Sequence, residues 1–372
     1  MDSPIFVQWE QWENRIQEWL NQSTEDTLDL TNTTSFERMI LSILSVKYQI
    51  VYQNLNQENS SAVTKKHSER IFSVRLSKNK LFDLERRKER DRDKLILFVQ
   101  LTSRYLTPEQ MNSEASPEWQ ELNDLCDWHG SVFLQRFRNC LLQFLRELIF
   151  SNPAYQEFIR QPVKVPAVPE IINQIYEVRN DGKVFLSVDM KSANFSMLQY
   201  IHTIDAQIYP TWADFLSVFV GARPIITNSK KLRMDCFGDL PERHKLHALY
   251  LYYTTNIYQT TLRRCLAERN VDAKCAALTG DEVIFHLDDS IDTDRICDLV
   301  QYVQSSLDKE SPLVRFIVQA YRIRAFNWQQ EHLCFARLFV GNNDNKFDLK
   351  CVPHRDRNYD QACHDFLETH IL

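Results

Sequence analysis

Two apolar stretches that carry carboxylates constrain the fold of this chain more than any other feature. The first is Val-Phe-Leu-Ser-Val-Asp189, and the second is Ala-Ala-Leu-Thr-Gly-Asp281-Glu-Val-Ile-Phe-His-Leu287. Short apolar runs bounded by turn residues are typical of buried β-strands. Because Gly280 and Asp281 favour a tight turn, the second stretch predicts a hairpin with acidic residues at its tip.

The residues around these motifs predict the rest of a sheet domain. Ser192 is a suitable N-cap for a helix after Asp189, and the residues from about 205 to 270 are typical of a helical insertion. Beyond the hairpin we expect a helix and then further strands, over residues 292–307, 313–325 and 334–340. Without the insertion, the order is strand, helix, hairpin, helix, strand. This is the ferredoxin-like arrangement, an antiparallel sheet with helices on one face.

The first part of the chain has a different character. Of the six glycines, only Gly130 precedes residue 180, and few glycines mean few tight turns, which suits long helices. Pro162, Pro166 and Pro169 then favour an extended segment. We therefore predict an α+β protein with a helical domain over residues 1–160, a proline-rich linker over 161–170 and the sheet domain over 171–372.

Composition limits the environment of the protein. A formal net charge of −6 argues against bulk, non-specific binding of nucleic acid but permits a local basic groove. The sequence has no apolar run of the roughly 18 residues that a membrane span needs, and no secretory signal at its start. None of the nine cysteines forms a Cys-x-x-Cys pair, which indicates reduced thiols. We expect an intracellular protein, in cytoplasm or nucleus, with no membrane partner.

The acidic residues are the candidate catalytic site. If the two motifs form neighbouring strands, Asp189 lies beside Asp281 and Glu282, and such carboxylates repel each other unless a cation neutralises them. Mg²⁺ or Mn²⁺ suits these oxygen ligands, and a pair of ions about 3.5–4 Å apart supports phosphate chemistry. We expect Asp189 and Asp281 to bridge the metals, the Met190 carbonyl to complete one coordination sphere, and Glu282 to be an outer or third ligand. In the alternative interpretation, Asp189 caps a helix and the hairpin tip is only a turn.

Basic residues near the motifs are candidates for binding phosphate. Lys191 follows the first carboxylate by two positions, and Lys230, Lys231 and Arg233 cluster within the insertion. A site that handles a triphosphate needs such cations nearby. The alternative for these side chains is a solvated helix face.

The two motifs resemble motifs A and C of the polymerase palm and nucleotide-cyclase superfamily. The resemblance rests on Val-Phe-Leu-Ser-Val-Asp189 with Asn-Phe195 after it, and on Leu-Thr-Gly-Asp281-Glu-Val-Ile-Phe. The hairpin is similar to those of class III nucleotide cyclases, diguanylate cyclases and tRNA-His guanylyltransferases, but no specific family is assigned. Thr279 departs from the diguanylate cyclase pattern, which has a glycine there.

This resemblance implies a palm-type sheet domain and a metal-dependent nucleotidyltransferase. Such an enzyme moves a nucleoside monophosphate from a nucleoside triphosphate to an end or a template-primer of RNA or DNA. One alternative is a nucleotide cyclase on the same fold. A second is a palm-derived module without catalysis, which binds a protein partner through its N-terminal helical domain.

Overall fold

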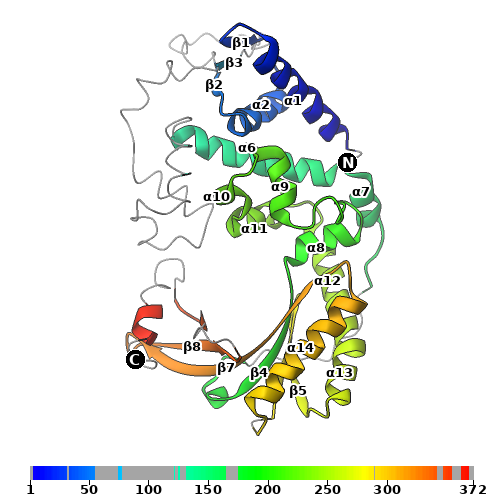
Figure 1. Cartoon of the computed structure of the whole chain (residues 1–372), viewed down its shortest axis with the longest axis vertical. Helices are drawn as coiled ribbons and strands as arrows, with labels where there is room; N and C mark the ends of the chain where they lie inside the picture. The colour runs from blue at the N-terminus through cyan, green and yellow to red at the C-terminus, as the bar shows by residue number, and fades with distance from the viewer. Residues whose placement is uncertain are drawn as a thin grey trace, which may run out of the picture. The chain divides into compact units, whose positions relative to one another are not determined.

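The computed structural model describes residues 3–31, 33–54, 74–77, 121, 125, 131–164, 175–288, 290–341, 347–353 and 362–367. The chain divides into two compact units (Figure 1). The first unit comprises Met1–Phe158 and His202–Pro241, and the second comprises Ile159–Ile201 and Glu242–Leu372. The chain therefore enters the second unit, returns to the first and enters the second again.

The first unit is built mainly from helices. They are α1 (Pro4–Gln22), α2 (Ser35–Lys47), α6 (Ser131–Phe150), α7 (Pro153–Arg160), α9 (Trp212–Val220), α10 (Pro224–Thr227) and α11 (Lys230–Gly238). Helix α2 begins with a capping box, in which the Thr34 side chain accepts from the Glu37 N–H and the Glu37 side chain accepts from the Thr34 N–H. The motif is visible in the sequence, where Glu37 follows Thr34 by three positions.

Aromatic packing explains why part of the predicted insertion belongs to the first unit. The ring of Phe219 in α9 lies 5.1 Å from Trp9 in α1 and 5.2 Å from Phe144 in α6, measured between ring centroids. All three side chains are fully buried. Aromatic rings dominate core energetics, so this cluster joins residues 202–241 to the N-terminal helices. The sequence analysis places the whole insertion in the C-terminal domain, and the structure differs from it there.

The first unit also contains a small sheet that the sequence analysis does not predict. Its strands are β1 (Thr27–Leu30), β2 (Val51–Asn54) and β3 (Val74–Ser77), and they pair antiparallel in the order β1-β3-β2. The prediction of an almost wholly helical domain over residues 1–160 misses these three strands. Strands of four residues are too short for their periodicity to be told from that of a helix.

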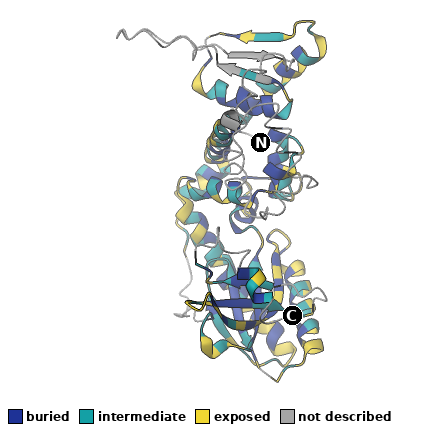
Figure 2. Ribbon diagram, turned by 90° about the vertical axis from the view of Figure 1, so that its left-hand side faces the viewer, coloured by how far each residue is buried: buried dark blue, intermediate teal, exposed yellow. Residues whose placement is uncertain are grey.

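The second unit contains a six-stranded antiparallel sheet in the order β5-β6-β4-β7-β8-β9. The strands are β4 (Val184–Met190), β5 (Ala273–Leu278), β6 (Glu282–Leu287), β7 (Phe316–Trp328), β8 (His332–Phe339) and β9 (Phe347–Lys350). Strand β4 lies between β6 and β7, and residues 184–188 are all buried (Figure 2). The mixed helix and sheet content confirms the α+β class.

Helices cover one face of this sheet (Figure 1). They are α8 (Ala193–Tyr200), α12 (Arg243–Ile257), a π-helical turn η5 (Tyr258–Leu262), α13 (Arg263–Glu268) and α14 (Thr293–Glu310). Tyr253 stacks on Phe316 of β7, and Tyr258 packs on Phe285 of β6. Because side chains alternate along a strand, Leu186 and Val188 of β4 share this helix-covered face.

The opposite face of the sheet carries a second apolar cluster. Its buried members come from the five neighbouring strands β5, β6, β4, β7 and β8 and from the segment before η4 (Val178–Asn180), and they include Ile175, Phe185, Ile284, Tyr321 and Phe335. Ser187 and Asp189 lie on this face beyond Phe185, towards the end of β4. No helix in the described residues has the length and apolar character needed to cross a membrane.

Candidate carboxylate site

The two acidic motifs meet at one end of the central strands. In the antiparallel register of β4 and β6, Asp189 lies directly opposite Glu282. One position further, the Met190 N–H donates to the Asp281 carbonyl at 2.8 Å. The predicted pairing of the first strand with the hairpin is thus confirmed. Directly opposed residues have Cβ atoms about 4.5–5.5 Å apart, so the Asp189 and Glu282 side chains are neighbours on one face.

The hairpin tip is packed tightly against α12. A methyl group at position 280 would lie 2.5 Å from Tyr250 Cε2 and 3.1 Å from His247 Nε2, so only glycine fits beneath these rings. Burial, followed by the charge of Asp281, raises the pKa of Tyr250 to about 12. Tyr250 is therefore a neutral phenol at physiological pH, and it fixes the turn that presents Asp281.

Glu282 of β6 is held by two partners from other strands of the sheet, Ser187 of β4 and Arg337 of β8. The Ser187 hydroxyl donates to Glu282 Oε1 at 2.6 Å, and Arg337 Nη1 donates to the same oxygen at 3.3 Å. The side chains of Arg337 and Glu282 are only 13% and 19% exposed. Ser187, Glu282 and Arg337 are called the strand cluster below.

Arg337 lies between two aromatic rings. Its Cζ is 4.5 Å from the ring centroid of Tyr321 and 5.5 Å from that of Tyr176, both within the range of cation–π attraction. Burial raises the pKa of Tyr176 to about 12. Burial alone would lower the pKa of Arg337, but Tyr321, Glu282 and Tyr176 raise it by more, so its pKa lies above the ordinary value. The guanidinium therefore carries a full charge.

The sequence analysis does not identify Arg337, although a signal is present. Arg337 stands within the run Leu-Cys-Phe-Ala-Arg337-Leu-Phe, where it is the only charge. Charged side chains are almost never buried unless they are paired, so an arginine inside an apolar strand predicts a buried partner. The identity of that partner depends on the sheet order, which the run does not contain.

The donor set decides how a metal would be held. Within the described residues, no group of three or more His, Cys, Asp or Glu side chains is arranged to hold a metal ion. Because Glu282 Oε1 binds Ser187 and Arg337, these contacts do not support the predicted role of Glu282 as a third ligand. Asp189 and Asp281 also lie at this end of the sheet. Mg²⁺ commonly takes one or two carboxylates from a protein and completes its shell with water and substrate phosphates.

Met190 and Lys191 continue from the end of β4. The Met190 side chain is buried, so any contribution to a metal would come from its backbone. The Lys191 N–H donates to the Arg315 carbonyl at 2.9 Å, which ties the end of β4 to the start of β7. Lys191, two residues after Asp189, is exposed, as a phosphate ligand would have to be.

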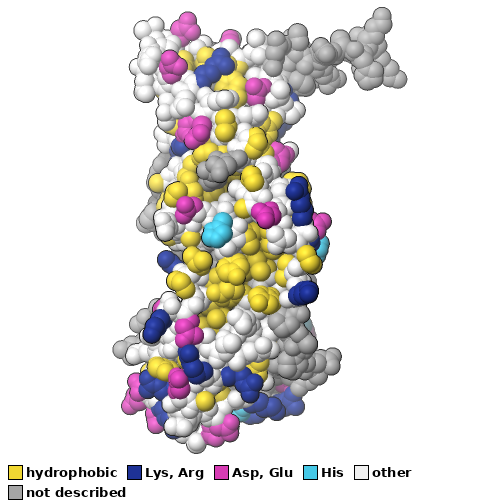
Figure 3. Space-filling view, turned by 90° about the vertical axis from the view of Figure 1, so that its right-hand side faces the viewer, with side chains coloured by type: hydrophobic (Ala, Val, Ile, Leu, Met, Phe, Trp, Pro, Cys, Tyr) yellow, Lys and Arg dark blue, Asp and Glu magenta, His cyan; other side chains and the backbone are white. Residues whose placement is uncertain are grey.

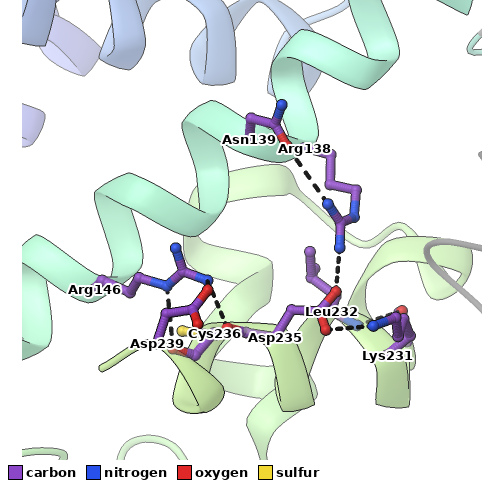
Figure 4. Close-up of polar contacts among 9 residues, drawn as sticks. Arg138, Asn139, Arg146, Lys231, Leu232, Asp235, Cys236 and Asp239 are labelled. Carbon is purple, nitrogen blue, oxygen red and sulfur yellow. Dashed lines mark hydrogen bonds and ion pairs between the residues drawn. The ribbon is translucent and has the colours of Figure 1, made fainter. Parts of the chain in front are cut away.

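The other predicted phosphate ligands, Lys230, Lys231 and Arg233, belong to the first unit. All three lie on α11, where Lys231 Nζ is 2.6 Å from Asp235 Oδ1 (Figure 4). Arg138 of α6 pairs with the same aspartate. Arg138, Lys231 and Asp235 are called the helix cluster below. Lys231 therefore has a partner within its own helix.

The sheet face beside Asp189 is partly open. Ile317 of β7, directly opposite Asp189, is 37% exposed, and its neighbour Gln319 is also exposed. On the face seen in Figure 3, Lys and Arg side chains are interspersed with Asp and Glu. Away from this face, Arg264 of α13 forms an ion pair with Glu310 of α14.

Comparison with known proteins gives no assignment. No protein-family model matches the sequence, and no curated protein matches it.

Proposed function

We propose that the second unit binds a nucleoside triphosphate together with Mg²⁺ or Mn²⁺ and transfers its nucleotidyl group to a nucleic-acid end or template-primer. The observation that carries this proposal is the register of β4 and β6, which brings Asp189 beside the tip that holds Asp281. Two carboxylates at the end of adjoining buried strands form a hard, anionic donor set that attracts a divalent ion with a bound phosphate.

The strand order supports a palm-type interpretation of this unit. Strands β4, β5, β6 and β7 are consecutive in the chain, and in the sheet they stand in the order β5-β6-β4-β7. If these four strands are numbered by their order in the chain, their order across the sheet is second, third, first and fourth, and every neighbouring pair is antiparallel. That order is expected of a ferredoxin-like βαββαβ unit. Strands β8 and β9 extend the sheet beyond it.

Each residue at the site has a distinct proposed role. Asp189 and Asp281 would hold the ion, with the Met190 carbonyl as a third oxygen, and the ion would supply charge neutralisation for the phosphates. Lys191 would bind a phosphate oxygen from its exposed position after β4. Glu282 would position the end of β6 through Ser187 and Arg337 rather than bind metal. The exposed Ile317 would contact an apolar face of the nucleotide.

One observation favours a second candidate, a palm-derived module that binds a partner without catalysis. The described residues contain no group of three or more metal-ligating side chains arranged to hold a metal ion, and one predicted carboxylate is paired with an arginine. A protein that had lost its chemistry would keep the sheet and lose the affinity for metal and nucleotide.

Titration calorimetry with Mn²⁺ and ATP separates these candidates. The wild-type chain should bind the complex, and Asp189→Asn and Asp281→Asn should each weaken binding about tenfold or more, since each removes a full charge next to the ion. Asp288→Asn is the matched control, because Asp288 is exposed and follows β6 at its opposite end. Absence of wild-type binding, or equal effects of all three substitutions, would contradict the proposal.

Incubation with α-labelled nucleotides and an oligonucleotide then identifies the reaction. Nucleotidyl transfer places the label on the oligonucleotide with release of pyrophosphate. A labelled cyclic nucleotide, formed without an oligonucleotide, would instead identify a cyclase.

A further inference from the structure

We infer that Arg337 sets the charge of the carboxylate site through Glu282, and so tunes its affinity for a divalent cation. This inference rests on the proposed function, because it concerns the same ion. It goes further by giving a role to a residue of β8 that neither motif contains.

Glu282 lies close to both aspartates of the proposed cation site. Glu282 is the direct cross-strand neighbour of Asp189, and it follows Asp281 in the chain. A negative charge on Glu282 therefore contributes to the field at any cation held by those two aspartates, in a setting where exposed solvent does not fully screen it. The binding of Ser187 and Arg337 to one oxygen of Glu282 fixes the place of this charge.

Arg337 neutralises the charge of Glu282. Arg337 donates to Glu282 at 3.3 Å, and both side chains are largely buried. With Arg337 present, the formal charge of Asp189, Asp281, Glu282 and Arg337 together is −2; without Arg337 it would be −3.

An arginine at position 337 keeps its positive charge when it is buried. A guanidinium does not lose its proton in proteins and stacks on aromatic faces, whereas a buried lysine is prone to deprotonation. The rings of Tyr321 and Tyr176 lie 4.5 and 5.5 Å from Arg337 Cζ, so they hold the charge in place from within the sheet. The neutralising charge is thus present whether or not a ligand is bound.

If Arg337 acts through its charge, substitutions of Arg337 and Glu282 should change Mn²⁺ affinity in opposite directions. If its role is only structural, both substitutions should weaken Mn²⁺ binding. If Arg337 sets the charge, Arg337→Met should tighten Mn²⁺ binding about tenfold, because Glu282 is no longer neutralised. Glu282→Gln should weaken binding by a similar factor, because Arg337 then adds an uncompensated positive charge. The double variant Glu282→Gln/Arg337→Met restores the charge of −2 and should bind within about threefold of wild type.

The experiment is a titration of each purified full-length variant with Mn²⁺, in which electron paramagnetic resonance measures the free ion. Opposite shifts for the two single variants, with recovery in the double variant, support the inference. Weaker binding in both single variants, or no change in either, overturns it. If Arg337→Met does not fold, the comparison of Glu282→Gln with the double variant decides alone: recovery supports the inference, and equal weakening overturns it.

The same titration tests the proposed function and the role of Arg337 separately. Failure of the wild-type chain to bind Mn²⁺ would reject the proposed function and this inference together. Wild-type binding that depends on Asp189 but does not respond to Arg337 or Glu282 would leave the proposed function standing and reject only the role of Arg337.

Discussion

The helix cluster and the strand cluster each pair a largely buried arginine with a carboxylate. Their burial is nearly the same: Arg138 and Asp235 are 13% and 21% exposed, and Arg337 and Glu282 are 13% and 19% exposed. The helix cluster joins α6 to α11 within the first unit (Figure 4). The strand cluster lies next to Asp189 in the second.

A basic residue that lies between the two acidic motifs in the sequence therefore need not contact their carboxylates, and one that lies far after them can do so. Lys231 lies between the two motifs in sequence, yet its observed partner is Asp235 four residues further along α11. Arg337 lies well after both motifs, yet it binds Glu282 directly. We therefore expect substitutions in the helix cluster to change stability only, and those in the strand cluster to change both stability and ion binding.

The largest effect is expected from Arg337→Met. It leaves Glu282 largely buried without its cation, which should lower the free energy of unfolding by about 3 kcal/mol. Urea denaturation followed by fluorescence measures this. Arg324→Met is the control, because Arg324 is half exposed and its ion pair with Asp181 is 3.9 Å long, so it should cost no more than about 0.5 kcal/mol. Equal effects of the two substitutions would show that the strand cluster contributes little.

Asp235→Asn should have the next largest effect. Removal of this charge leaves Arg138 and Lys231 without their shared partner, at an expected cost of about 2 kcal/mol. Mn²⁺ binding should stay unchanged, in contrast to the variants of the strand cluster. A change in ion affinity would break the comparison, since it would connect the helix cluster to the carboxylate site.

Gly280→Ala tests how firmly the hairpin tip is held. The new methyl group would overlap the Tyr250 ring, so we expect a loss of about 1–2 kcal/mol and weaker Mn²⁺ binding. Tyr250→Ala removes the ring, so combining the two substitutions should cost less than their sum. Strict additivity in thermal unfolding would mean that α12 does not fix the tip.

Lys231→Met should have the smallest effect on stability, about 0.5 kcal/mol, as is usual for an i,i+4 pair on a helix. Its effect on binding is more informative. ATP affinity should be unchanged for Lys231→Met but reduced for Lys191→Met, which removes the exposed cation after β4. The reverse pattern would restore the sequence-based prediction that the insertion binds phosphate.

Much of the second unit could be predicted because its signals are local. The apolar run before Asp189 and the turn residues at Gly280 specify a strand and a hairpin over a few positions. The α+β class follows from these elements. The start of α2 was equally readable from Thr34 and Glu37.

The remainder depends on contacts between distant parts of the chain. The membership of residues 202–241 in the first unit comes from the packing of Phe219 on Trp9 and Phe144. The contact of Arg337 with Glu282 depends on the strand order β6-β4-β7-β8, and this order cannot be predicted from any single segment of the sequence. The pairing of β1 with β3 likewise joins short segments far apart in the chain.

A crystal structure of the chain grown with Mn²⁺ and a non-hydrolysable nucleoside triphosphate tests the central claim most directly. The account predicts an anomalous manganese signal at bonding distance from carboxylate oxygens of both Asp189 and Asp281, with phosphate oxygens completing the shell and Glu282 still bound to Arg337. Manganese bound elsewhere, or no manganese at this end of the sheet under saturating conditions, would contradict it.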